Sequence, residues 1–505
     1  TLSKPTLDCP EVHANDIANL DKDLSDAESE TLSQAAWQAC VTRLNKEGVD
    51  LAAFNSLANA DDVAAIAQIL GHAHIDLYGV SYGSLLAQHV VERHPALVHA
   101  VILDGVVPKD REPNYEYYVS KNAAFSNLFA DCAADAACNA AYPNLKQTYV
   151  DVYNKLEANP ITLDLVDIKT DKSYPTLIDG ESFEGVVFQL HYDSELVTYL
   201  PMFITQVANE EYAVFKVLSG LIIFYDSMSE GMYRTTFCSE EQIPQASEIL
   251  IPQNPIIPID ADTGSTDAQS YAKMCAIASV PALDAKANQA FTTDTPTLLL
   301  SGRYDPITPA SMGDTVANGL PHATHIVFPN TAHGAFVDNA CAAQIGTAFL
   351  DNPQDIPNPS CVTDQKVTFA TPDTVAETPF TIQLIRANEA VYIPLGVMAT
   401  GLIVMLLAAV LRPLAWLTRR VLSRPQPTAA TRTLFGVQWL MIVSTLVWLG
   451  YVSYVYFDLI NPDGNYGYHS FFGVPTSYHL AATALVYVAA LSLIHISEPT
   501  RPERI

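Results

Sequence analysis

The sequence predicts an α/β fold with a mostly parallel sheet flanked by helices, and two observations support this prediction. Short apolar segments with the composition of buried strands occur at residues 75–78, 98–103, 297–300 and 325–328. The segment 59–70 begins with Asn and Asp and then repeats apolar residues every three or four positions, as a helix does. Short apolar strands that alternate with helices are typical of parallel sheets, because such strands are buried on both faces.

This alternation is interrupted once, and the interruption divides the chain into domains. Residues 107–294 are Tyr-rich and acidic, and they are long enough to form a separate, largely helical cap domain. We therefore expect residues 1–106 and 295–366 to form the two parts of the sheet domain. Residues 367–390 contain Thr and Pro and are predicted to be a tether.

The C-terminal quarter of the chain has the composition of transmembrane helices. Residues 391–411 and 434–457 carry no charge and reach the ~20 residues that cross a bilayer, and a third apolar run covers residues 476–490. A buried core helix is the alternative, but two such runs in tandem disfavour it. Five Arg residues lie between the first two runs, so the positive-inside rule places that loop in the cytoplasm. We expect residues 1–390 to lie on the extracytoplasmic side of a bacterial-type cell membrane.

All eight cysteines precede these apolar runs, and their even number favours disulfides formed in an oxidising compartment. Their spacing does not match a zinc site, so we predict neither a metal nor a cofactor. Other pairings remain open, but the simplest arrangement joins neighbours in sequence, which gives the pairs Cys9–Cys40, Cys132–Cys138, Cys238–Cys275 and Cys341–Cys361.

Both ends of the sequence differ from those of an exported membrane protein. The chain begins at Thr1 without Met and without a basic or apolar leader, so we expect that a signal peptide preceded it. Residues 491–505 read LSLIHISEPTRPERI, follow an apolar run without a helix stop, and resemble the translation of a sequencing-library adapter. We exclude this segment from the fold prediction and expect the gene to be interrupted within a membrane helix.

The chain is strongly acidic, with 55 acidic and 26 basic residues and a formal net charge of −29. This charge excludes binding of nucleic acid through its phosphates. Solubility, for example in a salty medium, explains the acidity in one interpretation. In the other, some of the carboxylates attract a cationic substrate.

The motif with the most chemical content is Gly79-Val80-Ser81-Tyr82-Gly83, a G-x-S-x-G pattern. The pattern alone is weak, but the apolar segment IDLY precedes it and the helical segment SLLAQHVVER follows it, as a nucleophile elbow requires. Small residues permit the tight, strained turn that lifts a Ser hydroxyl from the sheet. The N–H of Tyr82 and the dipole of the following helix would stabilise an oxyanion. A Gly-rich turn with a bystander Ser is the alternative.

A Ser nucleophile needs a base and a carboxylate that orients the base. Asp305 follows the apolar segment 297–300, and His333 follows the segment 325–328. The order Ser, acid, His is that of the α/β-hydrolase fold, in which such residues lie at the carboxyl ends of the strands. We therefore predict this fold with Ser81, Asp305 and His333 as a catalytic triad. The alternatives are a solvated turn Asp and a lone surface His.

The segments around these residues resemble the tripeptidyl-aminopeptidase-like branch of the proline iminopeptidase (S33-type) family of serine peptidases. The resemblance covers roughly residues 1–365 and is carried by LYGVSYGSLLAQHVVERHPALVHAVILDGVVP (77–108) and PTLLLSGRYDPITP (296–309). It implies an exopeptidase that releases residues or short peptides from a free N-terminus through an acyl-enzyme. Ser81 would attack, and His333, held by the acid, would move the proton.

The resemblance also implies two further features of the site. The family's second oxyanion donor lies in an HGGPG loop, and residues 2–12 resemble the stretch that follows it, so we expect this loop and the early strands to precede Thr1. Family members often hold the substrate amine with acidic cap residues, and Glu240 and Glu241 are candidates for this role. The alternative is that both are solvated surface carboxylates.

Three functional interpretations follow. The first is a membrane-anchored, extracytoplasmic serine exopeptidase whose partners are peptides with a free N-terminus and the lipid bilayer. The second is a carboxylesterase or lipase that uses the same triad on substrates without an amine. The third is a non-catalytic membrane-anchored module, an interpretation that fits the sequence as given because it does not include the second oxyanion donor.

Overall fold

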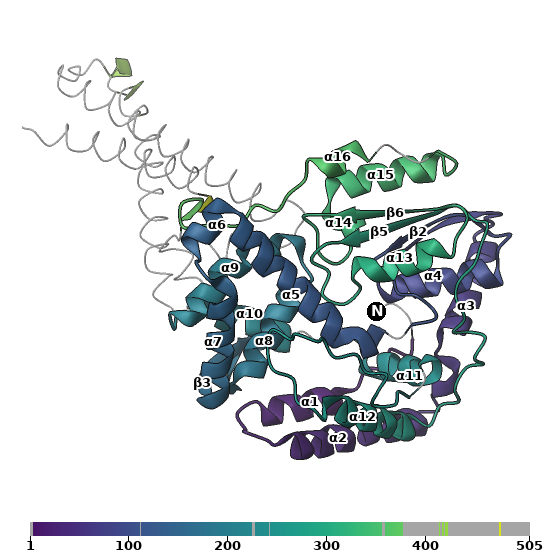
Figure 1. The fold of residues 1–505 in the computed structure, drawn as a ribbon, viewed down its shortest axis with the longest axis horizontal. Coiled ribbons are helices and arrows are strands. Elements are labelled where there is room, and N and C mark those ends of the chain that lie inside the picture. The colour runs from purple at the N-terminus through teal and green to yellow at the C-terminus, as the bar shows by residue number, and fades with distance from the viewer. Residues whose placement is uncertain are drawn as a thin grey trace, which may run out of the picture. The chain divides into compact units, whose positions relative to one another are not determined.

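A computed structural model describes residues 4–376, with gaps, and a few positions beyond them; the gaps are at 112, 225–227, 242 and 356–358, and the further positions are 414, 417–418, 420–422 and 474–475. The chain forms two compact units, Thr1–Phe369 and Ala370–Ile505. The first unit contains all the elements that position the predicted site residues, and its described part is drawn in colour in Figure 1.

A parallel sheet lies at the centre of the first unit, and in the described residues it has four strands in the order β1-β2-β5-β6. These strands are β1 (Ile75–Val80), β2 (Val98–Asp104), β5 (Thr297–Gly302) and β6 (Ala323–Phe328). Every residue of β5 is buried, as expected for an apolar strand that has helices on both faces. The predicted parallel sheet with flanking helices is confirmed.

Helices cover both faces of this sheet (Figure 1). On one face, Val101 and Leu299 pack with α3 (Ser56–Ile69), α4 (Tyr82–Arg93) and α13 (Ala310–Asn318). Alternate residues of the same strands point to the other face because side chains alternate along a strand. There Ile102 and Leu300 pack with residues of α14 (Ala335–Asp338) and α15 (Ala340–Asp351). The sheet is thus the middle layer of a three-layer core.

The chain between β2 and β5 forms the cap region. It is mostly helical, but β3 and β4 pair as an antiparallel hairpin within it. Five aromatic rings that are almost completely buried fill its interior: Phe125, Tyr149, Phe183, Phe203 and Phe215. Its elements are η2 (Pro113–Glu116), α5 (Tyr117–Ala134), α6 (Ala136–Ala141), α7 (Leu145–Ala158), β3 (Ile161–Asp167), β4 (Lys172–Ile178), α8 (Gly180–Leu190), α9 (Ser194–Ala208), α10 (Ala213–Ile223), α11 (Glu230–Glu240) and α12 (Thr263–Ala278).

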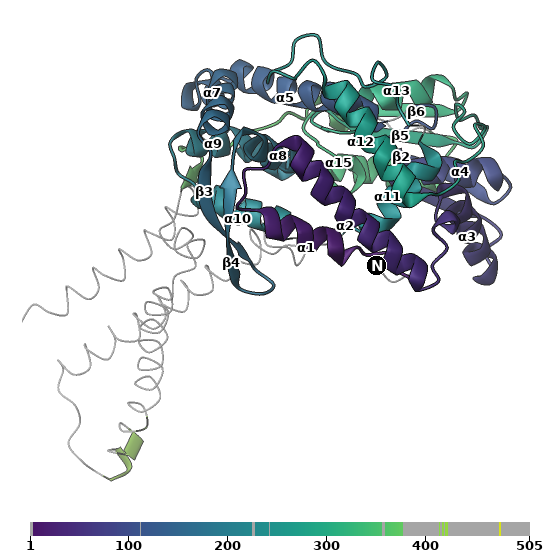
Figure 2. The ribbon, with the colours of Figure 1, turned by 90° about the horizontal axis from the view of Figure 1, so that it is seen from below.

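The N-terminal segment packs against the end of the cap region. It consists of α1 (Pro10–Asn19), α2 (Asp26–Lys46) and η1 (Leu51–Ala53), and Figure 2 shows α1 and α2 side by side. The fully buried Trp37 lies in one apolar cluster with Phe237 of α11, and its Nε1 donates a hydrogen bond to the carbonyl oxygen of Met274 in α12 at 3.0 Å. This N-terminal segment, which we predicted to be part of the sheet domain, therefore packs much of its apolar surface against the cap region.

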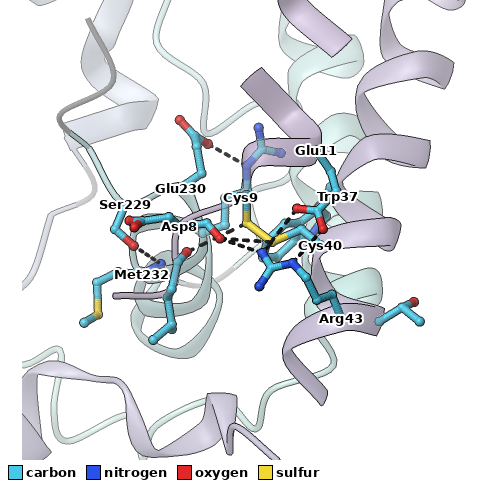
Figure 3. The surroundings of a disulfide bond; sticks show 12 residues. Asp8, Cys9, Glu11, Trp37, Cys40, Arg43, Ser229, Glu230 and Met232 are labelled. Atoms are coloured by element: carbon cyan, nitrogen blue, oxygen red, sulfur yellow. Dashed lines mark hydrogen bonds and ion pairs between the residues drawn. A yellow bond between two sulfur atoms is a disulfide. The ribbon is translucent and has the colours of Figure 1, made fainter. Parts of the chain in front are cut away.

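The first residues of the chain hold the start of α11 in place. The N–H of Gly231 donates to the carbonyl oxygen of Leu7 at 3.0 Å, and the Ser229 hydroxyl donates to the carbonyl of Thr6. A Cβ atom at Gly231 would lie 2.3 Å from the Leu7 oxygen, so this close approach requires glycine. Figure 3 shows the disulfide between Cys9 and Cys40 beside this contact. The disulfide ties the contact to α2.

All eight cysteines are paired in disulfides, and each is joined to its neighbour in sequence. The pairs are Cys9–Cys40, Cys132–Cys138, Cys238–Cys275 and Cys341–Cys361. The third pair joins α11 to α12, and the last joins α15 to α16 (Ser360–Thr363). The disulfide Cys238–Cys275 therefore cross-links the last two helices of the cap region.

The second unit is described at few positions, and these include the short antiparallel pair of β7 (Val375–Ala376) and β8 (Val474–Pro475). No helix among the described residues has both the length and the apolar character needed to cross a membrane. Several predictions from the sequence lie outside the described residues: the spans 391–411, 434–457 and 476–490, the remainder of the tether (377–390), and the segment 491–505.

We expect the disulfides to differ in their contribution to stability. Replacing Cys238 and Cys275 together with Ser should lower the free energy of unfolding by about 4 kcal/mol, because this bond closes a long loop with a sequence separation of 37. The same change at Cys132 and Cys138, with a separation of 6, should cost only about 2 kcal/mol. Urea titration followed by tryptophan fluorescence measures both losses. A larger loss at the short loop would contradict the loop-entropy explanation.

Candidate active site

Ser81 lies between β1 and α4, at the strand–turn–helix junction that the sequence predicts. Its backbone has φ 56° and ψ −127°, which is a strained conformation for a residue with a side chain. The surrounding structure holds it there: its N–H donates to the carbonyl of Asp104 at 2.9 Å, and its own carbonyl accepts the N–H of Ser84 at 2.8 Å. Tyr82 is the first residue of α4, so its N–H has no partner within the helix.

The two glycines of the motif have different functions. A Cβ atom at Gly79 would lie 2.1 Å from the carbonyl oxygen of Gly83, so only glycine permits the strand and the helix to approach here. A Cβ atom at Gly83 would meet no atom within 4 Å. The elbow therefore depends on Gly79 and tolerates a side chain at Gly83.

Asp305 and His333 follow β5 and β6, and the structure brings them together. The Nδ1 atom of His333 lies 2.8 Å from Oδ2 of Asp305. The carboxylate is 1% exposed and accepts three further hydrogen bonds, from the N–H groups of Ile307 (3.0 Å) and Thr308 (2.8 Å) and from the Thr308 hydroxyl (2.7 Å). These hydrogen bonds hold the buried carboxylate in one orientation, and the carboxylate in turn fixes the imidazole of His333. With Nδ1 bound to Asp305, the Nε2 atom of His333 is the one that can accept a proton.

Neighbours on several sides restrict the imidazole of His333. The ring of Tyr192 meets it edge-on, with 5.2 Å between the centroids, and the Tyr192 carbonyl accepts the backbone N–H of His333 at 3.2 Å. Gly105 has a φ of +53°, and a Cβ atom there would lie 2.9 Å from Cε1 of His333. The ring is therefore positioned by cap and sheet together, since Tyr192 comes from the cap region and Gly105 follows β2.

Asp104 is a buried carboxylate at the end of β2 that the sequence analysis missed. It accepts the N–H groups of Ala335 (2.9 Å) and Phe336 (2.8 Å) and the hydroxyl of Tyr78 (3.1 Å), and it thereby anchors the segment after His333. The sequence did contain a signal for Asp104, because this residue directly follows the predicted strand 98–103. Burial alone would lower the pKa of His333, but the carboxylates of Asp305, Asp104 and Asp338 outweigh burial and raise this pKa above its usual value.

A second set of Ser, His and Asp lies in the same domain. Nδ1 of His325 is 2.9 Å from Oδ1 of Asp314, and its Nε2 is 3.0 Å from Oγ of Ser301. Ser301 belongs to β5 and is completely buried. It presents no hydroxyl to a substrate, so hydrogen-bond geometry alone does not define a nucleophile.

A cavity of about 470 Å³ opens over Ser81. Helix α4 contributes Tyr82, Leu85 and His89 to its wall, and α11 contributes side chains from one broad face. The residues of α11 that line the cavity are Met232, Tyr233, Thr236, Phe237 and Glu240. The wall is therefore largely apolar and carries a few polar groups, as is usual for ligand sites.

The structure places Glu240 and Glu241 in the wall of the same cavity as Ser81. Glu240 is 8% exposed, and its carboxylate accepts hydrogen bonds from the N–H and the hydroxyl of Ser56, whose hydroxyl lies 2.6 Å from that of Tyr82. Burial raises the pKa of Glu240. The carboxylate of Glu241 accepts from the side-chain amide of Asn114 at 3.0 Å. Two carboxylates thus flank the space next to the candidate nucleophile.

Among the described residues, no group of His, Cys, Asp or Glu side chains is arranged to hold a metal ion. The structure pairs the imidazole of His333 with the carboxylate of Asp305 that orients it, and it places the Ser81 hydroxyl on a strained turn at the same edge of the sheet.

The sequence profile of the alpha/beta hydrolase fold family matches residues 33–340, a range that includes Ser81, Asp305 and His333. The chain therefore belongs to the alpha/beta hydrolase family. Serine protease Hip1 of Mycobacterium tuberculosis and that of Mycobacterium bovis are each 26% identical to it over 329 residues. The chain spans 62% of the length of these curated relatives, and the match covers 62% of this chain.

The matches among solved structures include a thermophilic esterase from Thermogutta terrifontis and a meta-cleavage product hydrolase from Pseudomonas fluorescens. The first is 15% identical and has a TM-score of 0.25, with 60% of this chain and 74% of that chain covered. The second is 11% identical and has a TM-score of 0.27, with 59% and 72% covered. The family match and the protease relative together support a hydrolase.

We expect Gly79→Ala to disrupt the elbow and Gly83→Ala to leave it intact. The first change should lower the free energy of unfolding by about 2 kcal/mol or more and abolish labelling of Ser81 by a fluorophosphonate, because the new Cβ separates β1 from α4. The second should leave labelling intact and change stability by at most about 1 kcal/mol, since Ala is favourable within a helix. Labelling that survives in Gly79→Ala would show that the elbow does not depend on this contact.

The raised pKa of His333 predicts how activity varies with pH. His333 must be neutral to accept the proton of Ser81, so kcat/KM should rise with pH through a pKa above its usual value of 6.5. Asp104→Asn removes a nearby negative charge, which lowers this pKa and should move the rising limb to lower pH. Tyr78→Phe is the control because it removes a neutral hydroxyl from the same carboxylate and keeps the charge. An unchanged pH profile of kcat/KM in Asp104→Asn would show that the charge of Asp104 does not raise the pKa of His333.

Proposed function

We propose that this protein is a serine exopeptidase that releases residues or short peptides from free N-termini through an acyl-enzyme. The observation that carries the proposal is the shared cavity, in which the candidate nucleophile Ser81 lies with the carboxylates of Glu240 and Glu241. The resemblance to tripeptidyl aminopeptidases and the similarity to a serine protease support the same class of reaction.

In the proposed reaction, His333 Nε2 takes the proton of the Ser81 hydroxyl while Oγ bonds to the scissile carbonyl carbon. The carbonyl oxygen becomes an oxyanion, which the N–H of Tyr82 stabilises. The carbon–nitrogen bond then breaks, His333 gives its proton to the leaving amine, and an ester to Ser81 remains. Water, deprotonated by His333, attacks this ester, and Ser81 leaves with the proton. Asp305 keeps the imidazole oriented in both halves of the reaction.

The carboxylates account for selection of a free N-terminus. A substrate ammonium that enters the cavity would form charge-assisted hydrogen bonds with Glu240 or Glu241. Hydrogen bonds from Ser56 and Asn114 already hold these side chains, so little side-chain entropy is lost on binding. The burial of Glu240 makes its negative charge costly until a cation arrives, which strengthens the preference for an amine over a neutral group.

We also propose that the protein acts on the extracytoplasmic side of a bacterial-type cell membrane, to which its C-terminal region attaches it. Four disulfides favour an oxidising compartment. The uncharged runs and the Arg-containing loop of the C-terminal sequence support the attachment and its orientation.

A carboxylesterase or lipase is the second candidate function. The side chains of Leu85, Met228, Met232 and Phe237 give the cavity a substantial apolar wall, which also fits an acyl chain. An esterase would need the triad and not the two carboxylates, so amine dependence separates the two functions.

We expect a tripeptide anilide with a free amine to be cleaved about 100-fold more efficiently than its N-acetylated form, because an ammonium hydrogen-bonded to a carboxylate contributes up to about 3 kcal/mol. Glu241→Gln should reduce this preference about tenfold or more and leave turnover of a short ester unchanged. Comparison of kcat/KM for the three substrates in wild type and Glu241→Gln tests this.

The control variant is Ser81→Ala, which should lose all three activities. Equal cleavage of both anilides, or turnover of esters alone, would reject the exopeptidase and favour the esterase. Activity that survives in Ser81→Ala would show that the triad is misassigned.

A further inference from the structure

Helix α4 presents a second polar side chain to the cavity, two turns beyond Ser81. Ser81, Leu85 and His89 follow one another at intervals of four residues and all line the cavity. This spacing places them along one side of the helix. At a rise of 1.5 Å per residue, His89 lies about 12 Å along the helix from Ser81. A fully extended peptide covers that length with about three to four residues.

The hydrogen bonding of His89 is incomplete. The residue is 2% exposed, and its Nδ1 atom is buried without a hydrogen-bond partner. Of the described residues that have such a buried, unpaired side-chain atom, His89 is the one that lines this cavity. Buried polar atoms are normally satisfied, so an imidazole left in this state beside a cavity indicates a ligand that completes it.

The charges around His89 indicate the chemistry of that ligand. Burial and the nearby cations of Lys109 and Arg93 lower the pKa of His89 to about 4, so the ring is neutral at physiological pH. It then has one N–H donor and one acceptor nitrogen. The two cations that line the cavity are each paired with a carboxylate, Lys109 with Glu92 and Arg111 with Glu116, so neither offers a free positive charge to a substrate carboxylate. A neutral hydrogen-bonding group such as a peptide bond fits better than an anion.

The position of the carboxylates indicates which part of a peptide reaches His89. Glu240 is linked through Ser56 to the hydroxyl of Tyr82, the first residue of α4. The proposed amine site is therefore connected to the start of α4, and His89 lies two turns farther along that helix. The amine site and Ser81 both lie at the start of α4, so a peptide that continues along the cavity beyond the scissile bond reaches His89.

We propose that His89 donates a hydrogen bond to a backbone carbonyl of the leaving peptide, about three residues beyond the scissile bond. This inference rests on the proposed exopeptidase function and adds the substrate class: peptides that continue for several residues after the cleaved bond. His89 acts as a substrate-binding residue and takes no part in the proton transfers.

Two substrates with the same N-terminal part test this inference, one with a single residue and one with four residues after the scissile bond. In the wild-type full chain, the longer peptide should have a KM about fivefold to tenfold lower at similar kcat. His89→Leu should abolish this difference, and His89→Gln, which keeps an N–H donor, should retain most of it. Turnover of a short ester by the wild-type chain and by Ser81→Ala serves as the control for the triad.

Each outcome is assigned to one of the two proposals. If the wild type hydrolyses the ester in a Ser81-dependent reaction but cleaves neither peptide, the exopeptidase function is rejected. If it cleaves both peptides with equal KM, or if His89→Leu keeps the full difference, only the inference about His89 is overturned. The wild-type comparison decides this even if His89→Leu does not fold.

Discussion

The buried carboxylate of Asp305 is the group on which the rest of the site depends. It is almost completely shielded from water, and four donors surround it, one of them the imidazole of His333. Three of the donors belong to the same loop as Asp305, whereas His333 reaches it because β5 and β6 are parallel neighbours, so that the loops at their carboxyl ends lie at one edge of the sheet. Ser81 after β1 and Asp104 at the end of β2 join the same edge.

The cap region supplies the rest of the candidate active site. Its helix α11 forms much of the cavity wall and ends in the two carboxylates proposed to bind the amine. The helix is held at its start by the backbone contact of Gly231 with Leu7, and along its length by the disulfide to α12. Substrate selection is thus positioned by the cap, whereas the proton-transfer groups are positioned by the sheet, and Tyr192 links the two by packing on His333.

The parts of the site that the sequence revealed are those encoded in short, local patterns. The elbow around Ser81 and the loops of Asp305 and His333 each follow an apolar strand directly, and strand order then brings them together. Asp104 also follows an apolar strand directly, but its role, like that of His89, comes from contacts that the sequence does not show, with residues 335–336 and with the cavity wall respectively. The packing of Trp37 on the cap was also missed, since the apolar face of a helix does not specify which domain it covers.

The strand order of the sheet also determines when the domain can fold. β2 and β5 are neighbours in space, yet the whole cap region lies between them in the chain. The first residues of the chain likewise cannot make their contact with the start of α11 until that helix has been synthesised. Contacts between such distant segments form slowly, because a long loop must close before they contribute any stability. During synthesis, β1 and β2 therefore emerge first and stay without their third neighbour until β5 has followed, so the catalytic edge is assembled late.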